Sequence, residues 1–445
     1  MLAEVLRSPP AEIVKDDRAK FVARHEVNGR AFYVKRYRHG GYLLRPLKFW
    51  IKRSQAEQEW RLAGELEKRG VPIVRHVAFG ELWSVRGLLE SVLITESFNG
   101  APIGPQHERH FVRVVEFVRD MARAGVAHSD FHPANLLLNE TSGEIRLIDL
   151  YGAKISDGEP VAGLADALLA QLCVSLPLPV SANVKFAGGA LRRERLAQRA
   201  RRCLKSNRDF TAKDFGNFHW QVRRAALTPQ VEAVLADPDA FLARGRVLKD
   251  GRSSTVATAD ALVLKRHNFR KLLNPLKDMF RGSRGRRDFL KAYHLELCDI
   301  PTARVLATTD HRLLGVPVRS FVLMEEIPDA THAGQAGRAE MIQLAQLIAG
   351  LHNNGFTHRD LKETNILFSR DGRPFLIDLD GLKFVSAVEP SDAASNLRRL
   401  AEGLTSAGRL TRENVILFML HYCRLRQVSP RKLFPRARPR GRKEF

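Results

Sequence analysis

Apolar and polar residues follow one another in patterns that predict strands in the first part of the chain. Residues 21–37 contain two alternating runs joined by an Asn-Gly pair, which indicates a β-hairpin. Residues 54–70 have helical spacing and end at a glycine, a residue that commonly closes a helix. Residues 91–98 form a short apolar run, which predicts another strand. These patterns together predict a small sheet accompanied by one helix.

The residues that follow predict mainly helices around a short hairpin. Residues 108–125 are amphipathic with helical spacing, and they lead directly into a His-Ser-Asp segment. Residues 136–149 read as two short strands joined by a turn. Most of the remaining pattern before residue 230 is helical. A small sheet-rich lobe followed by a larger helical lobe is an α+β arrangement.

This order of elements occurs twice along the chain, with a period near 230 residues. The segment HSDFHPANLLL corresponds to HRDLKETNILF, and IDLYGAK corresponds to IDLDGLK. Such a period is too long for a solenoid repeat and indicates a duplicated domain. Two prolines within residues 228–238 interrupt the pattern. We therefore expect domains at residues 1–230 and 238–445, the second ending in a basic tail.

Four polar residues recur in both copies at nearly the same spacing. In the first copy, Lys35 is followed by Asp130 after 95 residues, by Asn135 after five more and by Asp149 after fourteen more. The second copy repeats the set with intervals of 95, five and thirteen, at Lys265, Asp360, Asn365 and Asp378. A lone His-x-Asp is a weak signal, but this longer pattern occurring twice is a strong one.

These residue types are the ones that phosphoryl transfer requires. A strand lysine neutralises the phosphates of a nucleotide, and Lys35 lies within an apolar strand pattern. An Asn and an Asp supply the hard oxygen ligands that Mg²⁺ prefers. A second Asp accepts the proton of the attacking hydroxyl. The pattern therefore predicts an ATP- and Mg²⁺-dependent phosphotransferase.

The motifs resemble those of known kinases. HRDLKETNIL with IDLDG resembles the catalytic and metal-binding loops of protein kinases, whereas HSDFHPANLL with IDLYG is closer to small-molecule phosphotransferases. Two longer segments, AEQEWRLAGELEKRGVPIVRHVAFG and GSRGRRDFLKAYHLELCDIPTARVLA, resemble the lipopolysaccharide kinase (Kdo/WaaP) family. The resemblance covers most of both copies and implies two protein-kinase-like domains in tandem, each with a β-rich N-lobe and a helical C-lobe.

The resemblance also implies a role for individual residues. Asp130 and Asp360 would be the catalytic bases, and Lys362 would approach the γ-phosphate in the second copy. The lysines would hold the α and β phosphates, and Glu96 and Glu326 would lie at the hinge that meets adenine. The metal ligands would be Asn135, Asp149, Asn365 and Asp378.

Each copy departs from the protein kinase pattern at a different place. Protein kinases pair the strand lysine with a helix glutamate, for which the first copy offers Glu59, with Glu57 as a rival. The second copy offers only Asp288, which is one methylene shorter and puts the lysine contact in question. Its phosphate loop could use Gly251, Ser253 and Ser254, whereas the first copy has Asp17 in place of the glycine.

Composition narrows the class of protein further. The chain of 445 residues is 44% hydrophobic and 27% charged, an ordinary globular composition that excludes disordered and collagen-like chains. Its four cysteines are far apart and suggest neither a zinc site nor a disulfide framework, which fits a reducing compartment. The N-terminal segment lacks the pattern of a secretory signal, and residues 161–184, the most apolar stretch, are interrupted by polar residues and prolines.

The net charge of +23 predicts an anionic partner. Basic residues concentrate at residues 44–53, 191–208 and 431–443. We expect them to bind an anionic membrane surface, because aromatic residues accompany them in the first stretch. No C₂H₂, RRM or KH pattern accompanies the charge, so we do not expect a nucleic-acid partner.

The first hypothesis is a kinase that phosphorylates a Kdo or heptose hydroxyl of the lipopolysaccharide inner core. The resemblance implies a lipopolysaccharide core or lipid A precursor as acceptor, and a place at the cytoplasmic face of the inner membrane as a peripheral protein. A Ser/Thr or Tyr protein kinase is the first alternative, favoured by HRDLK in the second copy. A scaffold built of nucleotide-binding pseudokinase domains is the second. The sequence leaves the oligomeric state open.

Overall fold

The chain forms two compact units in a computed structural model, Met1–Arg192 and Arg193–Phe445. The structure describes residues 2–17, 19–39, 49, 52–85, 87–156, 161–268, 282–313, 316–332, 337–408 and 410–434. Most of the basic stretch at residues 44–53 and most of the basic tail at 431–443 lie outside the described residues.

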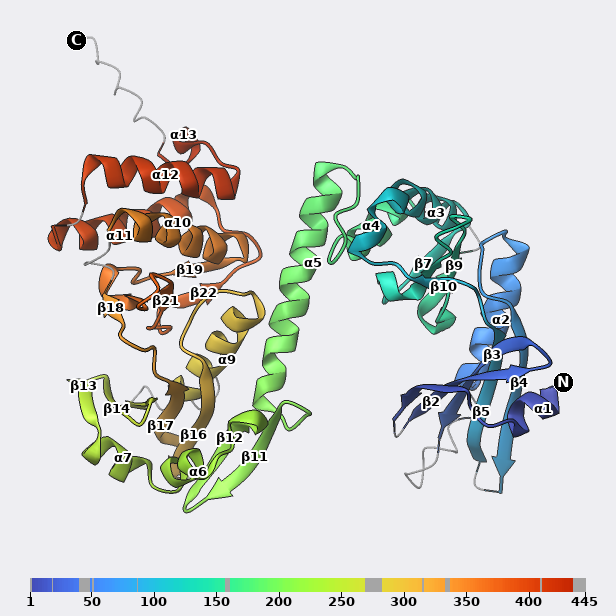
Figure 1. Ribbon diagram of the computed structural model, residues 1–445, viewed down its shortest axis with the longest axis horizontal. Coiled ribbons are helices and arrows are strands. Elements are labelled where there is room, and N and C mark those ends of the chain that lie inside the picture. The colour runs from blue at the N-terminus through green and yellow to red at the C-terminus, as the bar shows by residue number, and fades with distance from the viewer. Residues whose placement is uncertain are drawn as a thin grey trace, which may run out of the picture. The chain divides into compact units, whose positions relative to one another are not determined.

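The first unit begins with a five-stranded antiparallel sheet, drawn in blue in Figure 1. The strand order is β1-β2-β3-β5-β4. The short helix α1 (Leu2–Arg7) precedes the sheet, and helix α2 lies between β3 and β4 in sequence. The bounds are β1 Glu12–Asp16, β2 Lys20–Val27, β3 Arg30–Arg38, α2 Gln55–Lys68, β4 His76–Ser84 and β5 Gly87–Glu96.

Local sequence explains these elements. Asn28 and Gly29 both have positive φ, as the tight turn between β2 and β3 requires. The Ser54 hydroxyl accepts a hydrogen bond from the Glu57 N–H and so caps α2. Buried Phe32 and Val34 of β3 belong to the sheet core. The predicted hairpin and helix are therefore confirmed.

The rest of the first unit is mainly helical. Its core is made by α3 (Phe111–Arg123), α4 (Leu164–Leu172) and the start of α5 (Ala182–Ala200), packed on short strands. Gly125 has positive φ and ends α3 where the sequence predicts. The short elements are β6 Ala101–Pro102, η2 Pro105–His110, β7 Val126–His128, η3 Pro133–Asn135, β8 Leu136–Leu138, β9 Ile145–Leu147, η4 Leu150–Gly152 and β10 Ala153–Ile155.

The second unit opens with a seven-stranded sheet in the order β11-β12-β16-β17-β15-β14-β13. Helix α9 occupies the place that α2 has in the first unit. The bounds are η5 Arg201–Leu204, β11 Phe210–Phe215, β12 Phe218–Arg223, η6 Arg224–Ala226, α6 Pro229–Ala236, α7 Pro238–Arg244, β13 Arg246–Gly251, β14 Ser254–Ala259, β15 Leu262–His267, α9 Arg284–Leu297, β16 Val305–Leu313 and β17 Val316–Glu325.

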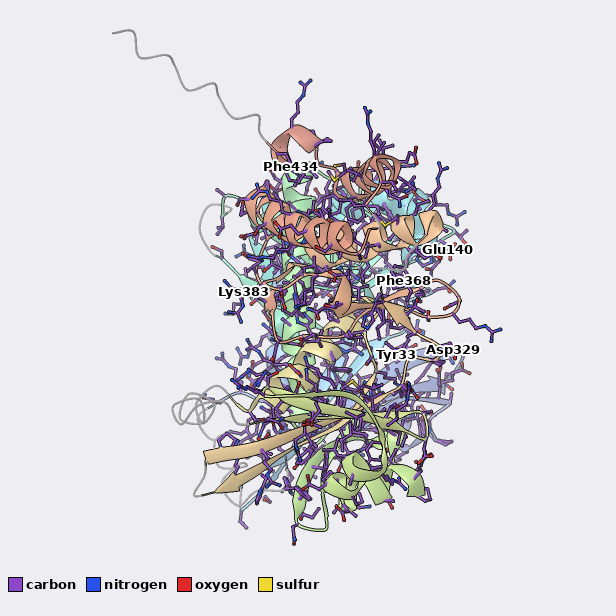
Figure 2. The ribbon with its side chains drawn as sticks, turned by 90° about the vertical axis from the view of Figure 1, so that its left-hand side faces the viewer. Tyr33, Glu140, Asp329, Phe368, Lys383 and Phe434 are labelled. Carbon is purple, nitrogen blue, oxygen red and sulfur yellow. The ribbon has the colours of Figure 1, made fainter. Side chains whose placement is uncertain are left out.

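The C-terminal part of the second unit is again mainly helical, and in Figure 1 its helices (orange to red) lie together at the opposite end of the unit from the sheet. Phe368 and Lys383, labelled in Figure 2, mark two of its short strands, β20 and β22. The bounds are β18 Thr331–His332, α10 Arg338–Asn353, β19 Phe356–His358, η8 Glu363–Asn365, β20 Ile366–Phe368, β21 Pro374–Leu376, β22 Leu382–Phe384, α11 Pro390–Ser406, α12 Arg412–Arg426 and α13 Pro430–Leu433.

The boundary between the units lies earlier than the sequence indicates. We expected a change of domain at residues 230–238, but residues 210–223 form two strands of the second sheet. Trp220 of β12 pairs with Thr309 of β16 and is fully buried. The alternation of Phe218, Trp220 and Val222 is the signal of this strand, and we had read the region as mostly helical.

The described helices include none that is long and apolar enough to cross a membrane. All four cysteines are free.

Candidate active site

The strand lysine of the first unit forms a buried ion pair with the helix glutamate. Lys35 Nζ on β3 lies 3.0 Å from Glu59 Oε2 on α2, whose side chain is 1% exposed. Lys35 also approaches Asp149 Oδ1 at 3.7 Å. The rival Glu57 instead pairs with Arg61 at 2.8 Å and Arg53 at 3.4 Å. Glu59 is therefore the partner of the lysine.

The second unit forms the same pair despite its shorter carboxylate. Lys265 Nζ on β15 lies 3.0 Å from Asp288 Oδ2 on α9 and 3.6 Å from Asp378 Oδ1. The question that the missing methylene raised is answered, since Asp288 reaches its lysine at the same distance as Glu59 does.

Hydrogen bonds within a few residues fix the catalytic loop of the first unit. His128 Nδ1 accepts from the Asp130 N–H at 3.3 Å, and His128 Nε2 lies 3.2 Å from the Asp149 carbonyl oxygen. Asn135 Nδ2 donates to the Asp130 carbonyl at 3.0 Å, which leaves the amide oxygen of Asn135 as its acceptor. A Cβ at Gly152 would lie 2.7 Å from His128 Cε1, so the histidine ring fits there because the glycine has no side chain.

The second unit repeats this loop. Asp360 N–H donates to His358 Nδ1 at 3.2 Å, and Asn365 Nδ2 donates to the Asp360 carbonyl at 2.7 Å. Lys362 Nζ lies 3.1 Å from Asp360 Oδ2. A Cβ at Gly381 would lie 2.8 Å from His358 Cε1. His128 and His358 therefore position the loops.

Charge gathers around Asp149 in the first unit. Burial alone would raise the pKa of Asp149, but Lys35 and Lys20 outweigh it and hold that pKa below its ordinary value. Lys20 Nζ, at the start of β2, lies 3.6 Å from Asp149 Oδ1. Burial opposes the charge of Lys35 as well, yet Glu59 and Asp149 raise its pKa. The charged forms of Asp149 and Lys35 thus stabilise each other, whereas burial and the charge of Lys35 lower the pKa of Lys20.

The two units differ in backbone conformation at the last of the four repeated polar residues, Asp149 in the first unit and Asp378 in the second. Asp149 has φ 59° and ψ 61°, in the left-handed region that few residues other than glycine adopt. Asp378 is not among the described residues with positive φ. Backbone strain of this kind costs about 1–3 kcal/mol and gathers at functional sites.

The phosphate loops also differ. In the first unit, the Asp17 carboxylate accepts hydrogen bonds from the N–H groups of Ala19 and Lys20 at 2.8 and 2.7 Å. These two bonds, with Lys15, lower the pKa of Asp17 to about 2. The carboxylate therefore occupies N–H groups of the turn between β1 and β2, the kind of backbone donors that can also bind an anion.

In the second unit, Gly251 stands at the position of Asp17 and pairs with Ser254 across the turn. Asn268 Nδ2 donates to the Gly251 carbonyl at 2.9 Å, and Arg284 donates to the Ser253 carbonyl at 3.2 Å. Ser254 itself is buried. The loop is thus held by side chains from outside it.

The two glutamates predicted at the hinge, Glu96 and Glu326, are not at equivalent positions in the two sheets, and the difference is one residue. Glu96 ends β5, pairs with Phe32 across the sheet and lies 3.4 Å from Arg75. In the second unit, Glu325 pairs with Leu262 and lies 2.9 Å from Arg304. The structural counterpart of Glu96 is therefore Glu325, and Glu326 is the residue that follows it.

Comparison with known proteins agrees with this geometry. The model of the lipopolysaccharide kinase (Kdo/WaaP) family matches residues 10–156 and 280–422, more than half of the chain. The chain belongs to this family. The first matched segment contains Lys35, Glu59 and Asp149. The second contains Asp288 and Asp378, whereas Lys265 lies just before it. One segment falls within each unit, so membership applies to both units.

Two curated relatives of this chain are named 3-deoxy-D-manno-octulosonic acid kinase. The protein of Xanthomonas euvesicatoria pv. vesicatoria is 38% identical over 123 residues, which are 26% of this chain and 48% of the relative. That of Xanthomonas axonopodis pv. citri is 37% identical over 123 residues with the same coverage. The chain spans about half the length of the curated relatives it matches.

A solved structure titled "WaaP in complex with acyl carrier protein" is 25% identical and covers 43% of this chain and 81% of its own. Its TM-score is 0.30. At so low a score, the assignment of the fold rests on the strands and helices of this chain and on family membership.

Some side chains that hold the two loops could not be predicted from the spacing of the sequence motifs. The Gln171 side chain on α4 bonds the backbone of Phe131 and His128, at 3.0 and 3.1 Å. Asn396 on α11 bonds both backbone groups of His358 at 3.0 Å. Neither residue lies in a motif, so only the fold relates them to the loops.

The second unit carries an additional charge network. Arg284 pairs with the Asp380 carboxylate, and Lys291 Nζ donates to the Leu379 carbonyl at 2.7 Å. Side-chain atoms of His267, Asp288 and Asp380 lie within 4.8 Å of one another, as metal ligands can. Lys265 and Arg284 already bind the two carboxylates, so we interpret the cluster as an ion-pair network.

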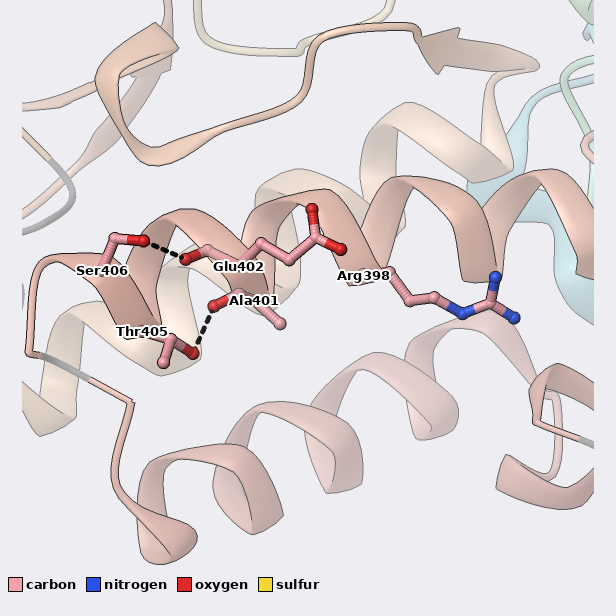
Figure 3. A pocket seen from close by; sticks show the side chains of 5 residues that line it. All are labelled: Arg398, Ala401, Glu402, Thr405 and Ser406. Carbon is pink, nitrogen blue, oxygen red and sulfur yellow. Dashed lines mark hydrogen bonds between the residues drawn. The ribbon is translucent and has the colours of Figure 1, made fainter.

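A surface hollow beside α11 is separate from these residues (Figure 3). Both hydroxyls that line it are used within the helix, since Thr405 donates to Ala401 O at 2.7 Å and Ser406 donates to Glu402 O at 3.0 Å. The hollow therefore offers little chemistry of its own. Its lining residues are Arg398, Ala401, Glu402, Thr405 and Ser406.

Proposed function

We propose that this chain is an ATP- and Mg²⁺-dependent kinase that phosphorylates a hydroxyl of a Kdo or heptose residue in the lipopolysaccharide inner core. Family membership and relatives named for a Kdo kinase activity support the acceptor. The observation that carries the chemistry is the repeated lysine–carboxylate pair at 3.0 Å beside a third acidic group.

The residues of the first unit fit a nucleotide with its metal ion. Asp149 is held as a carboxylate, and Asn135 keeps its amide oxygen as an acceptor, so the pair has the hard oxygen donors that Mg²⁺ binds. When bound, the ion would neutralise charge on the phosphates during transfer. Lys35 would contact the α and β phosphates, and Asp130 would accept the proton of the sugar hydroxyl.

We assign the sugar chemistry to the first unit. The left-handed backbone at Asp149 supports this assignment, because Asp378, its counterpart in the second unit, does not have a positive φ. Its Asp-Phe-His-Pro-Ala-Asn loop also resembles small-molecule phosphotransferases. The position of the Asp17 carboxylate counts against this assignment, because the carboxylate would have to leave the turn for a phosphate to bind there.

The proposed place of action is the cytoplasmic face of the inner membrane. The net charge of +23 supports attachment to anionic lipid, and the basic residues of α5 add to it. Exposed charges are screened within about 8 Å at physiological ionic strength, so binding to anionic vesicles should weaken steeply with salt. Retention that does not depend on salt would contradict electrostatic attachment.

A protein kinase is the second candidate, favoured by the Lys362–Asp360 pair at 3.1 Å. Incubation of γ-labelled ATP with core oligosaccharide, with a mixed protein pool, or with the chain alone separates the candidates. We expect label on the oligosaccharide. Label on protein would favour the second candidate, and no transfer despite nucleotide binding would favour a pseudokinase scaffold.

Calorimetry tests the nucleotide sites themselves. We expect two Mg²⁺-dependent ATP sites in the wild type, and Asp149→Asn and Asp378→Asn should each remove one. A wild-type chain without Mg²⁺-dependent ATP binding would overturn the proposed function.

A further inference from the structure

In both units, the residue two positions after the strand lysine contacts the same helix carboxylate as the lysine. These residues are Tyr37 on β3 and His267 on β15. Residues two apart on a strand share one face, so each side chain lies beside its lysine. Both are buried, with Tyr37 at 5% and His267 at 3% exposure. Neither belongs to the motifs that define the nucleotide site.

The first unit uses both oxygens of its carboxylate. Lys35 Nζ lies 3.0 Å from Glu59 Oε2, while the Tyr37 hydroxyl donates to Glu59 Oε1. Burial and then the charge of Glu59 raise the pKa of Tyr37, so the phenol remains a donor. Glu59 is thereby held from two sides, and its free rotation is removed.

The second unit has the same arrangement around its helix carboxylate, built from shorter side chains. Lys265 Nζ and His267 Nε2 lie 3.0 and 3.1 Å from the same oxygen, Asp288 Oδ2. Asp288 Oδ1 and both ring nitrogens of His267 are buried without a hydrogen-bond partner among the described residues, so His267 meets Asp288 as a close charge contact and not as an aligned hydrogen bond. The imidazole thus lies against the carboxylate at the position where the first unit has a phenol.

The helix that carries the carboxylate also differs between the two units, at one position in its first turn. Gly285 in the first turn of α9 donates its N–H to Ser320 Oγ at 3.1 Å. A Cβ at Gly285 would lie 3.1 Å from Ser320 Cβ and from Phe321 O, closer than such contacts ordinarily are. In the first unit the corresponding residue is Ala56, which is fully buried against the sheet. The glycine lets α9 approach its sheet more closely than a methyl group would allow.

We propose that Tyr37 and His267 are positioning residues for the nucleotide lysines, in triads whose side-chain lengths match the approach of the helix to the sheet. Alanine, glutamate and tyrosine form the long set in the first unit, and glycine, aspartate and histidine form the short set in the second. The inference rests on the proposed function, because it assigns the triads to the binding of ATP phosphates by Lys35 and Lys265.

Exchanging the sets within the first unit tests the match. The parent is the full chain with Asp378→Asn, which leaves the first unit as the Mg²⁺-dependent site, and calorimetry with Mg-ATP is the measurement. Glu59→Asp alone should weaken binding by at least about tenfold, and Tyr37→Phe by about threefold or more, because each removes a buried charge-assisted contact. Adding Ala56→Gly and Tyr37→His to Glu59→Asp should restore affinity to within about threefold of the parent.

Glu57→Asp is the matched control, since it makes the same change on α2 at a carboxylate that binds Arg61 and Arg53. It should leave the affinity unchanged. The inference is overturned if the triple variant binds as weakly as Glu59→Asp alone, or if Tyr37→Phe binds as tightly as the parent. A parent without Mg-ATP binding would instead overturn the proposed function, and the inference with it.

Discussion

Replacing Glu59 with glutamine removes one charge from the buried pair of the first unit and keeps the shape of the side chain. Glu59 is 1% exposed and Lys35 is 14% exposed, so the lysine cannot turn to bulk water without moving the strand or the helix. Removal of one partner of a buried ion pair costs about 3–5 kcal/mol. Asp149, 3.7 Å from Lys35, still offers a counter-charge, so we expect the lower end of that range.

The expected loss converts to a measurable shift in melting temperature. For a unit of this size, each kcal/mol lowers the midpoint by about 2–4 °C, so Glu59→Gln should lower it by about 6–12 °C. Hydrogen exchange read by mass spectrometry assigns the loss to a unit. Peptides from β2, β3 and α2 should lose protection, while those from β14, β15 and α9 should not change.

Glu57→Gln serves as the control, because Glu57 binds arginines at the surface of the same helix and surface pairs contribute little. The reasoning is refuted if Glu59→Gln melts within about 1 °C of the wild type, a shift smaller than any buried pair would give. Loss of protection in the second unit alone would contradict it equally.

Two further predictions concern the phosphate loop and the pH dependence of stability. Asp17→Gly should tighten Mg-ATP binding at the first unit by several-fold, because it frees the Ala19 and Lys20 N–H groups, and calorimetry showing weaker binding would contradict that role of the loop. Burial lowers the pKa of His352 to about 4, below the value near 6.5 of an unfolded chain, so its contribution to stability is present above about pH 6.5 and lost as the pH falls towards 4. The loss should reach about 2 kcal/mol at pH 5, and urea unfolding of His352→Gln should show a smaller decrease between pH 7.5 and 5 than the wild type.

The catalytic loops could be predicted from sequence because their hydrogen bonds are local. Asn135 bonds the Asp130 carbonyl five residues away, and His128 bonds the Asp130 N–H two residues away. Such contacts fix the spacing of a motif, and the same spacing recurs at Asp360 and Asn365. The assignment of Glu59 over Glu57 required the structure, because Lys35 reaches it across 24 residues and two elements.

Contacts between distant segments explain what the sequence did not reveal. Trp220 pairs with Thr309, a residue of a strand that lies far along the chain. Because the sequence does not show this partner, it does not show that residues 210–223 belong to the second unit, which begins after Arg192. Lys20 meets Asp149 only because the turn between β1 and β2 lies over the C-terminal lobe of its own unit. The pairing of Tyr37 with Glu59 is similarly invisible until the helix is placed against the strand.

Transfer of label from γ-labelled ATP to purified core oligosaccharide tests the central claim most directly. The wild type should label a Kdo or heptose residue in the presence of Mg²⁺, and Asp130→Ala should lower the rate by about 10²-fold to 10⁴-fold, as loss of a general base does. Asp360→Ala should leave much of the transfer intact. Loss of transfer in Asp360→Ala but not in Asp130→Ala would reverse the assignment of the units, and transfer unaffected by either change would contradict the account.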